Sequence, residues 1–260
     1  MKKYTLLIII LLLLPLSGQT QDKIYKFDWK KELVTLGSGV GLYALGVHLK
    51  NKVSAPTIAQ INALNPDNLN RFDRIAINNS SANAKEISDV ILYSSLSLPV
   101  IAYFIPKCRF EGTAVGLMAV EAILITNGLT NITKGLTTRY RPSTYNPNVD
   151  LATKLESGSR LSFFSGHTSV STAMSFLMAT VITDVHADMN NKFIIWTTAA
   201  IIPAAIGYFR FEAGRHFPTD VISGYAVGAL VGYFIPKLHK RDKMQLTTNG
   251  TGLSLYINLN

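Results

Sequence analysis

Residues 113–134 read TAVGLMAVEAILITNGLTNITK, an apolar stretch that contains no Arg or Asp and ends at the cation Lys134. As a helix it has the length of a membrane span, and Glu121 is its one acid. Five further stretches lack Lys, Arg and acidic residues: 33–49, 90–106, 168–183, 193–209 and 221–236. They predict an all-α, membrane-embedded bundle of five or six apolar helices. A soluble bundle with helices buried on every face is the alternative.

The composition agrees with a membrane protein. Hydrophobic residues make up 48% of the 260 residues and charged residues 16%, against about 25% charged in a typical soluble domain. The net charge of +9 suits an anionic partner, which is a nucleic acid, a membrane surface or a phosphorylated substrate. Cys108 is the only cysteine, so an internal disulfide and a thiolate metal cage are excluded.

The two ends of the chain carry their own signals. Two lysines precede an apolar run at 6–14 that is followed by small residues, which is typical of a secretory signal peptide. Apolar and polar residues alternate over 253–260, after an Asn-Gly pair, and predict a short β-hairpin. The expected parts of the chain are a signal peptide (1–20), an N-terminal helix with a polar connection (21–87), a helical core (88–238) and a polar tail with the hairpin (239–260).

Cations and histidines gather at three places, each at the end of an apolar stretch. The three clusters are Lys134 with Arg141 and Pro142; Ser165, Gly166 and His167; and Arg210, His216 and Asp220. The Lys and the two Arg side chains suit a phosphoryl group. The free amides of a helix that begins near Gly166 would also favour an anion. If the four helices alternate in direction, all three clusters lie on the same side of the bundle.

The histidines suggest a chemistry for this pocket. Because His216 and Asp220 are four residues apart, the carboxylate can accept a hydrogen bond from one ring nitrogen and leave the other as a nucleophile. His167 then remains as a proton donor to the leaving oxygen. A metal site built from the same three side chains is the rival interpretation. We expect no metal, because the three cations would repel a divalent ion.

The combined pattern resembles a known family. Lys134-x6-Arg141-Pro142, Ser165-Gly166-His167 and Arg210-x5-His216-x3-Asp220 resemble the three-part signature of the type 2 phosphatidic acid phosphatase family, which is related to class A acid phosphatases and vanadium haloperoxidases. Two positions depart from it, since Phe164 stands where the family usually has Pro and Phe209 where it has Ser.

The resemblance implies roles for these residues. His216 would form a phosphohistidine, Asp220 would orient it, and His167 would protonate the leaving group. The phosphoryl oxygens would be held by Lys134, Arg141, Ser165, Gly166 and Arg210. It implies neither a metal nor another cofactor. Outside the motifs, we expect Glu121 to form a hydrogen bond within the bundle, and His239 has no partner that the sequence indicates.

The expected function is a membrane phosphatase that hydrolyses lipid phosphomonoesters or pyrophosphates. Its partners would be a phosphorylated lipid and the bilayer, without nucleic acid, and the sequence carries no prediction of oligomeric state. Alternatives are a soluble secreted acid phosphatase of broad specificity and a non-catalytic lipid-binding membrane protein. We expect a bacterial-type inner membrane, with the active site facing the periplasm or exterior. Six crossings after a cleaved signal would reverse that orientation, so either residues 33–49 cross incompletely or the amino terminus stays inside.

Overall fold

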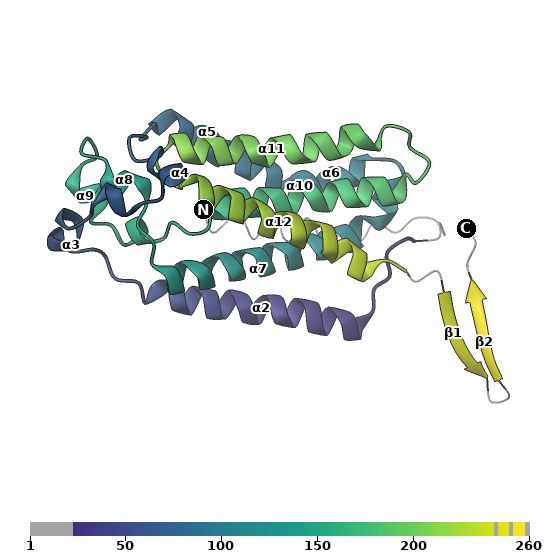
Figure 1. The fold of residues 1–260 in the computed structure, drawn as a ribbon. Coiled ribbons are helices and arrows are strands. Elements are labelled where there is room, and N and C mark those ends of the chain that lie inside the picture. Colours follow the sequence, from purple (N-terminus) through teal and green to yellow (C-terminus); the bar gives the residue numbers. More distant parts are fainter. Residues whose placement is uncertain (1–22, 242–243, 250–251, 258–260) are drawn as a thin grey trace.

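The computed structural model describes residues 23–241, 244–249 and 252–257, and shows long helices packed side by side (Figure 1). The long helices are α2 (Trp29–Asn51), α5 (Ala82–Leu96), α7 (Gly112–Thr137), α10 (Gly166–Val185), α11 (Lys192–Glu212) and α12 (Pro218–His239). Five of the six expected apolar stretches fall inside these helices: 33–49, 113–134, 168–183, 193–209 and 221–236. For the remaining stretch, 90–106, the helix begins earlier, because Ser81 caps α5 by accepting a hydrogen bond from the Ala84 amide.

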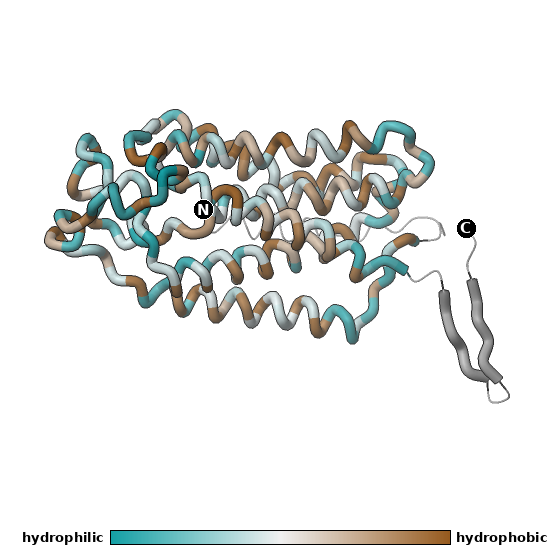
Figure 2. Tube along the Cα trace, in the orientation of Figure 1, coloured by the Kyte–Doolittle hydropathy of each residue, from teal (hydrophilic) through white to brown (hydrophobic). Residues whose placement is uncertain are grey.

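Short elements complete the chain. α6 (Leu98–Ile101) and η2 (Ala102–Phe104) continue the line of α5, and η3 (Lys107–Glu111) leads into α7. The connections at the opposite end contain α3 (Ile58–Asn62), η1 (Pro66–Asn68), α4 (Arg71–Arg74), α8 (Pro142–Tyr145), α9 (Leu151–Lys154) and η4 (Ser157–Arg160). They form a polar cap over one end of the bundle (Figures 1 and 2).

Successive long helices alternate in direction (Figure 1). One end of the bundle, here called the motif end, holds Lys134, Gly166 and Asp220. The other, the far end, holds Trp29 and His239. The helix ends that carry the three clusters therefore lie at one end of the bundle, as expected for helices that alternate in direction.

α10 lies at the centre of the bundle and is buried on all sides over most of its length. Its Met174 and Leu177 pack with Met118 of α7 in the apolar core. Close approach depends on glycine, because a Cβ at Gly228 of α12 would collide with the Ser169 carbonyl of α10. Small residues at such contacts let two helix backbones come together, and this fixes α12 against α10.

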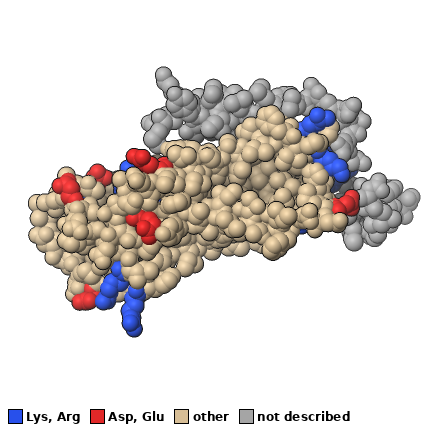
Figure 3. Space-filling view, turned by 90° about the horizontal axis from the view of Figure 1, so that it is seen from above, with Lys and Arg blue, Asp and Glu red and all other residues tan. Residues whose placement is uncertain are grey.

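The outer faces of the bundle are apolar. Large exposed side chains include Leu33, Val40 and Leu45 of α2, Phe193 and Ile201 of α11, and Ile222 and Leu230 of α12. On the face drawn in Figure 3, charged side chains gather toward the two ends and leave an uncharged stretch between them. A soluble monomer rarely exposes so much contiguous apolar surface. The faces fit a lipid environment and count against the soluble alternative.

Within the part of the chain that the structure describes, six helical segments are long and apolar enough to cross a membrane. α2 is one of them, and its 23 residues span about 35 Å. α2 lies along α7, where Gly46 approaches Gly128 and Asn131. The chain is therefore a membrane protein with a bundle of six candidate spans, and residues 33–49 lie within a helix of full spanning length.

Two short strands follow the bundle. β1 (Met244–Asn249) and β2 (Gly252–Ile257) pair antiparallel, with Met244 opposite Ile257. The strands extend away from the far end of the bundle (Figure 1). Long helices make up most of the described structure, so the fold is classed as helical. The expected signal peptide, residues 1–20, lies outside the described residues.

Candidate active site

The motif end brings residues from five segments together. α7 ends at Thr137, its C-cap residue Thr138 has a left-handed φ of 43°, and the chain then turns toward the start of α12. There Arg139 forms an ion pair with Asp220, at 2.5 Å between Nη1 and Oδ1. Its other Nη is 2.7 Å from Asp73 Oδ2, and its guanidinium lies over the Phe217 ring. Arg139, which follows the third span, thus connects the start of the sixth span with the polar connection that carries Asp73.

His216 lies in the turn between α11 and α12. Gly214, with φ of 62°, makes this turn possible, and its carbonyl accepts a hydrogen bond from the Ser143 amide. The His216 side chain is 1% exposed, and its Nδ1 is 3.7 Å from Asp220 Oδ2. The expected hydrogen bond between them is therefore not formed, and Nδ1 is buried without a hydrogen-bond partner among the described residues. At 3.7 Å the imidazole of His216 and the carboxyl group of Asp220 still interact electrostatically.

Asp220 is held from several sides. Its Oδ2 accepts hydrogen bonds from Ser162 Oγ at 2.5 Å and from the Phe217 amide at 2.9 Å. Its backbone carbonyl accepts one from the Ser165 amide at 3.0 Å. These donors and the cation Arg139 fix the position of the Asp220 side chain. The hydrogen bond from the Ser165 amide to the Asp220 carbonyl joins the second and third motifs.

The second motif starts α10. Ser165 is the N-cap residue, and its hydroxyl contacts Thr168 Oγ1 at 2.9 Å. Gly166 follows at the first turn, where an added Cβ would lie 3.7 Å from Lys134 Nζ. The amino group of the first motif therefore lies beside the amino terminus of α10, and both favour an anion.

His167 has a partner that the sequence did not indicate. Its Nε2 is 2.7 Å from Asp89 Oδ1, and the same oxygen accepts a hydrogen bond from Arg210 Nη1 at 3.2 Å. Arg210 also donates to Ser88 Oγ at 3.3 Å. Asp89 and Ser88 lie on α5, which no motif includes. The sequence feature that could have identified Asp89 is its position directly before the uncharged stretch 90–106, since acids in membrane helices are candidates for function.

Lys134, Arg141 and Arg210, here called the pocket cations, act on the same histidine. Burial lowers the pKa of His216 well below its usual range, and the pocket cations lower it further. His216 is therefore neutral at neutral pH, which leaves a lone pair on the ring. In the described part of the chain, no hydrogen-bond partner reaches the buried Nε atoms of Arg141 and Arg210. An oxyanion in the pocket would supply acceptors for such donors.

The histidines and Asp220 at the motif end do not form a group with metal-ligand spacing. Among the described residues, the one such group consists of Glu32, Glu121 and His239 at the far end. Glu121 contacts the Thr35 hydroxyl, so its expected hydrogen bond within the bundle is formed. His239, for which the sequence indicated no partner, has two, because Glu32 and Glu121 approach it across the bundle.

The fold and the pocket define a membrane-embedded helical protein with a buried, cationic histidine site. Residues 115–244, half of the chain, match the family model described as the PAP2 superfamily, and the chain belongs to this superfamily. A relative, the lipid A 4'-phosphatase of Porphyromonas gingivalis, is 28% identical over 127 residues, which cover 48% of this chain and 50% of that protein. The chain thus spans about half the length of this curated relative.

Two solved structures are also similar. One is the transmembrane PAP2 type phosphatidylglycerolphosphate phosphatase from Bacillus subtilis, with a TM-score of 0.48 and 22% identity over 76% of this chain and 93% of that one. The other is Aquifex aeolicus LpxE, with a TM-score of 0.42 and 26% identity over 63% of this chain and 92% of that one.

Proposed function

We propose that this protein is a membrane phosphatase that removes phosphate from a lipid phosphomonoester or pyrophosphate. The observation that carries the proposal is the neutral, buried His216 among three cations, with Asp220 at 3.7 Å. A neutral imidazole is a nucleophile, and cations stabilise the charge that spreads over the phosphoryl oxygens in the transition state. We take residues 88–238 as the phosphatase core.

In the proposed reaction, His216 Nε2 attacks phosphorus while the bond from phosphorus to the leaving oxygen breaks. His167 donates a proton to that oxygen. The positive charge that develops on the His216 ring lies close to Asp220, which stabilises it. In the second step, His167 takes a proton from water, the water oxygen attacks phosphorus, and the bond from nitrogen to phosphorus breaks. Inorganic phosphate is released, and neutral His216 is regenerated.

The remaining polar residues of the pocket would bind and orient the substrate. The pocket cations would hold the phosphoryl oxygens, together with the Gly166 amide and Ser165. The Ser165 hydroxyl also contacts Thr168 Oγ1 and caps α10. Asp89 orients His167 through Nε2. No step of this reaction needs a metal ion, so we propose that the chemistry is metal-independent.

A lipid substrate is supported by the position of the pocket and by the named relative. The pocket lies at one end of a bundle with apolar outer faces, so a phosphate at the membrane surface can reach it while its acyl chains stay in the bilayer. The curated relative is named as a lipid A 4'-phosphatase. A phosphorylated lipid, rather than a nucleic acid, is therefore the proposed partner.

We further propose that the motif end faces the periplasm or exterior of a bacterial-type inner membrane. Six crossings put the residues before Trp29 and the carboxyl-terminal tail on the same side. A motif end that faces outward therefore requires an amino terminus retained inside. The short connections of the far end carry Lys107, Arg109 and Lys192, as cytoplasmic loops tend to do. A reporter fused after Lys243 should read as cytoplasmic, and an external signal would overturn this orientation.

The activity itself is tested by phosphate release from a panel of phosphorylated lipids. The purified wild type should release phosphate, and His216→Ala should lose at least about 10³-fold in kcat because the nucleophile is gone. His186→Ala is the matched control, since His186 follows α10 at the far end of the bundle, where its Nδ1 is 3.2 Å from the Ile182 carbonyl. It should keep wild-type activity. A wild type inactive on every lipid would favour the non-catalytic lipid-binding alternative.

A further inference from the structure

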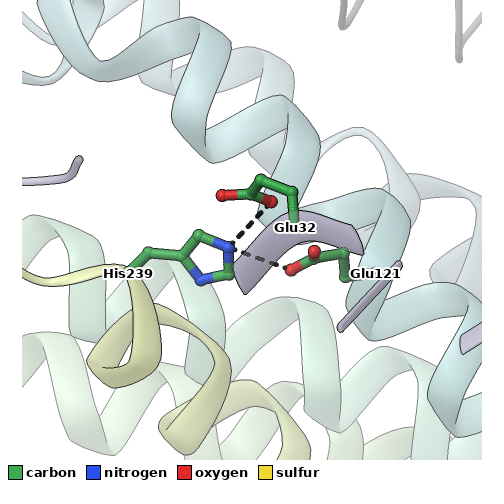
Figure 4. A group of neighbouring side chains, drawn as sticks. All are labelled: Glu32, Glu121 and His239. Atoms are coloured by element: carbon green, nitrogen blue, oxygen red, sulfur yellow. Dashed lines mark hydrogen bonds and ion pairs between the residues drawn. The ribbon is translucent and has the colours of Figure 1, made fainter. Parts of the chain in front are cut away.

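Three buried ionisable side chains meet at the far end of the bundle. Glu32 comes from the first turn of α2, Glu121 from the middle of α7, and His239 from the end of α12 (Figure 4). Asp220 and His239 are 19 residues apart on α12, which is about 28 Å. The group, here called the far-end triad, is therefore separate from the proposed active site.

The far-end triad places two carboxyl groups against one imidazole in a buried site. Glu32 is 6% exposed, Glu121 0% and His239 5%. Among the described residues, His239 is the one side chain with which either carboxylate forms an ion pair. Glu32 Oε1 and Glu121 Oε2 are buried, and neither has a hydrogen-bond partner within residues 23–241. Buried polar oxygens without partners are costly, and a bound cation would supply a partner for both of them.

The orientation of the imidazole ring also favours a bound cation. His239 Nδ1 is 2.9 Å from the Ile235 carbonyl, which can only accept a hydrogen bond. The proton of a neutral ring is therefore on Nδ1, and the lone pair is on Nε2. Nε2 faces Glu32 Oε2 and Glu121 Oε2, each at 3.2 Å (Figure 4). Three electron-pair donors thus converge, and a backbone carbonyl fixes the ring as it does for many metal-bound histidines.

The spacing of these donors suits a tetrahedral metal ion. Bonds of about 2.0 Å, typical of zinc with nitrogen or carboxylate oxygen, place tetrahedral ligands about 3.3 Å apart. Both distances from Nε2 to the carboxylate oxygens are 3.2 Å, and the three ligand atoms lie within 4.8 Å of one another. Imidazole and carboxylate ligands fit divalent transition metals, and zinc in particular.

We propose that Glu32, Glu121 and His239 bind a divalent transition-metal ion, with Zn²⁺ the best match. The ion neutralises the two carboxylates and links α2 to α7 and α12. Its role is structural, because the site is one helix length from His216. The segment before α2 adds to this connection, since the Lys26 amide donates to the His239 carbonyl and the Arg241 amide to the Ile24 carbonyl. The metal would thereby secure the first span to the rest of the bundle.

The test uses the untagged full chain, purified in detergent, treated with chelator, and then dialysed against micromolar Zn²⁺. Elemental analysis should find about one zinc per chain, as for a three-ligand site. Glu121→Gln should reduce the bound zinc by at least about tenfold. Asp184→Asn is the matched control, because Asp184 pairs with Lys237 and Lys240 near the same end without belonging to the far-end triad. It should keep its zinc.

Two further readouts keep the outcome clear. Zn²⁺ should raise the melting temperature of the wild type but not that of Glu121→Gln, which retains the side-chain volume and removes a buried charge. Phosphate release by folded Glu121→Gln should stay near the wild-type level, so failure here is distinguishable from failure of the proposed function. Zinc below about one tenth per chain in the wild type, or equal zinc in wild type and Glu121→Gln, would overturn the proposal. The far-end triad would then be an ion pair that shares a proton.

Discussion

Asp220→Asn isolates the electrostatic contribution of Asp220 to the proposed catalysis. The substitution keeps the shape of the side chain but removes its charge. An amide group cannot satisfy every neighbour, because Arg139 donates to Oδ1 while Ser162 and the Phe217 amide donate to Oδ2. Whichever way the amide is oriented, its NH₂ group faces a donor. We therefore expect a loss of about 2–4 kcal/mol in the free energy of unfolding.

The expected effect on the rate follows from the 3.7 Å between His216 Nδ1 and Asp220 Oδ2. A charged imidazole ring and a carboxylate at this distance attract each other by about 4 kcal/mol at an effective dielectric constant of about 20. The ring becomes charged only as the bond to phosphorus forms. The attraction therefore lowers the barrier, and its loss should reduce kcat by about 10³-fold.

Asp73→Asn is the matched control for this variant. Asp73 is as buried as Asp220 and pairs with the same guanidinium, at 2.7 Å from Arg139, but it belongs to the polar connection and not to the third motif. Both variants should lose comparable stability, measured as the melting temperature in detergent. Only Asp220→Asn should lose most of its kcat for phosphate release. If the folded variants differ by less than about tenfold in kcat, the electrostatic role of Asp220 is refuted.

Three further predictions concern the pocket and the helix contacts. Lys134→Met removes a cation that lowers the pKa of His216, so the pKa of His216 should rise. In the wild type, the acidic limb of the pH profile of kcat/KM lies below the usual histidine pKa of about 6.5. In Lys134→Met this limb should move to higher pH. An unchanged pH profile would contradict this placement of Lys134. Asp89→Asn should weaken the orientation of His167 and lower kcat by about tenfold or more, with the largest loss for substrates with poor leaving groups. Gly228→Ala would force α12 away from the Ser169 carbonyl and cost about 1–3 kcal/mol in stability, whereas Gly41→Ala, with open space around it, should be neutral or slightly stabilising. Equal melting temperatures of these two variants would exclude the close contact.

The helical class and the position of the motif end followed from the sequence. Absence of charge over the length of a span is a property of the residues themselves, and it does not depend on which helix packs against which. The spacing from Lys134 to Arg141, and from His216 to Asp220, is also local. Such spacing predicts the chemistry of each helix end, and alternation of the helices then brings the ends together.

Tertiary structure alone decided the partners of these residues. Asp89 reaches His167 from 78 residues earlier in the chain, and Glu32 reaches His239 across 207 residues. Such pairs depend on how far each helix is rotated and shifted along its neighbour, and close contacts such as that at Gly228 set this rotation and shift. Apolar lipid-facing residues do not encode that choice, because the bilayer accepts any of them. The uncharged stretches thus determined that the chain forms a membrane bundle, and helix packing determined which buried charges meet inside it.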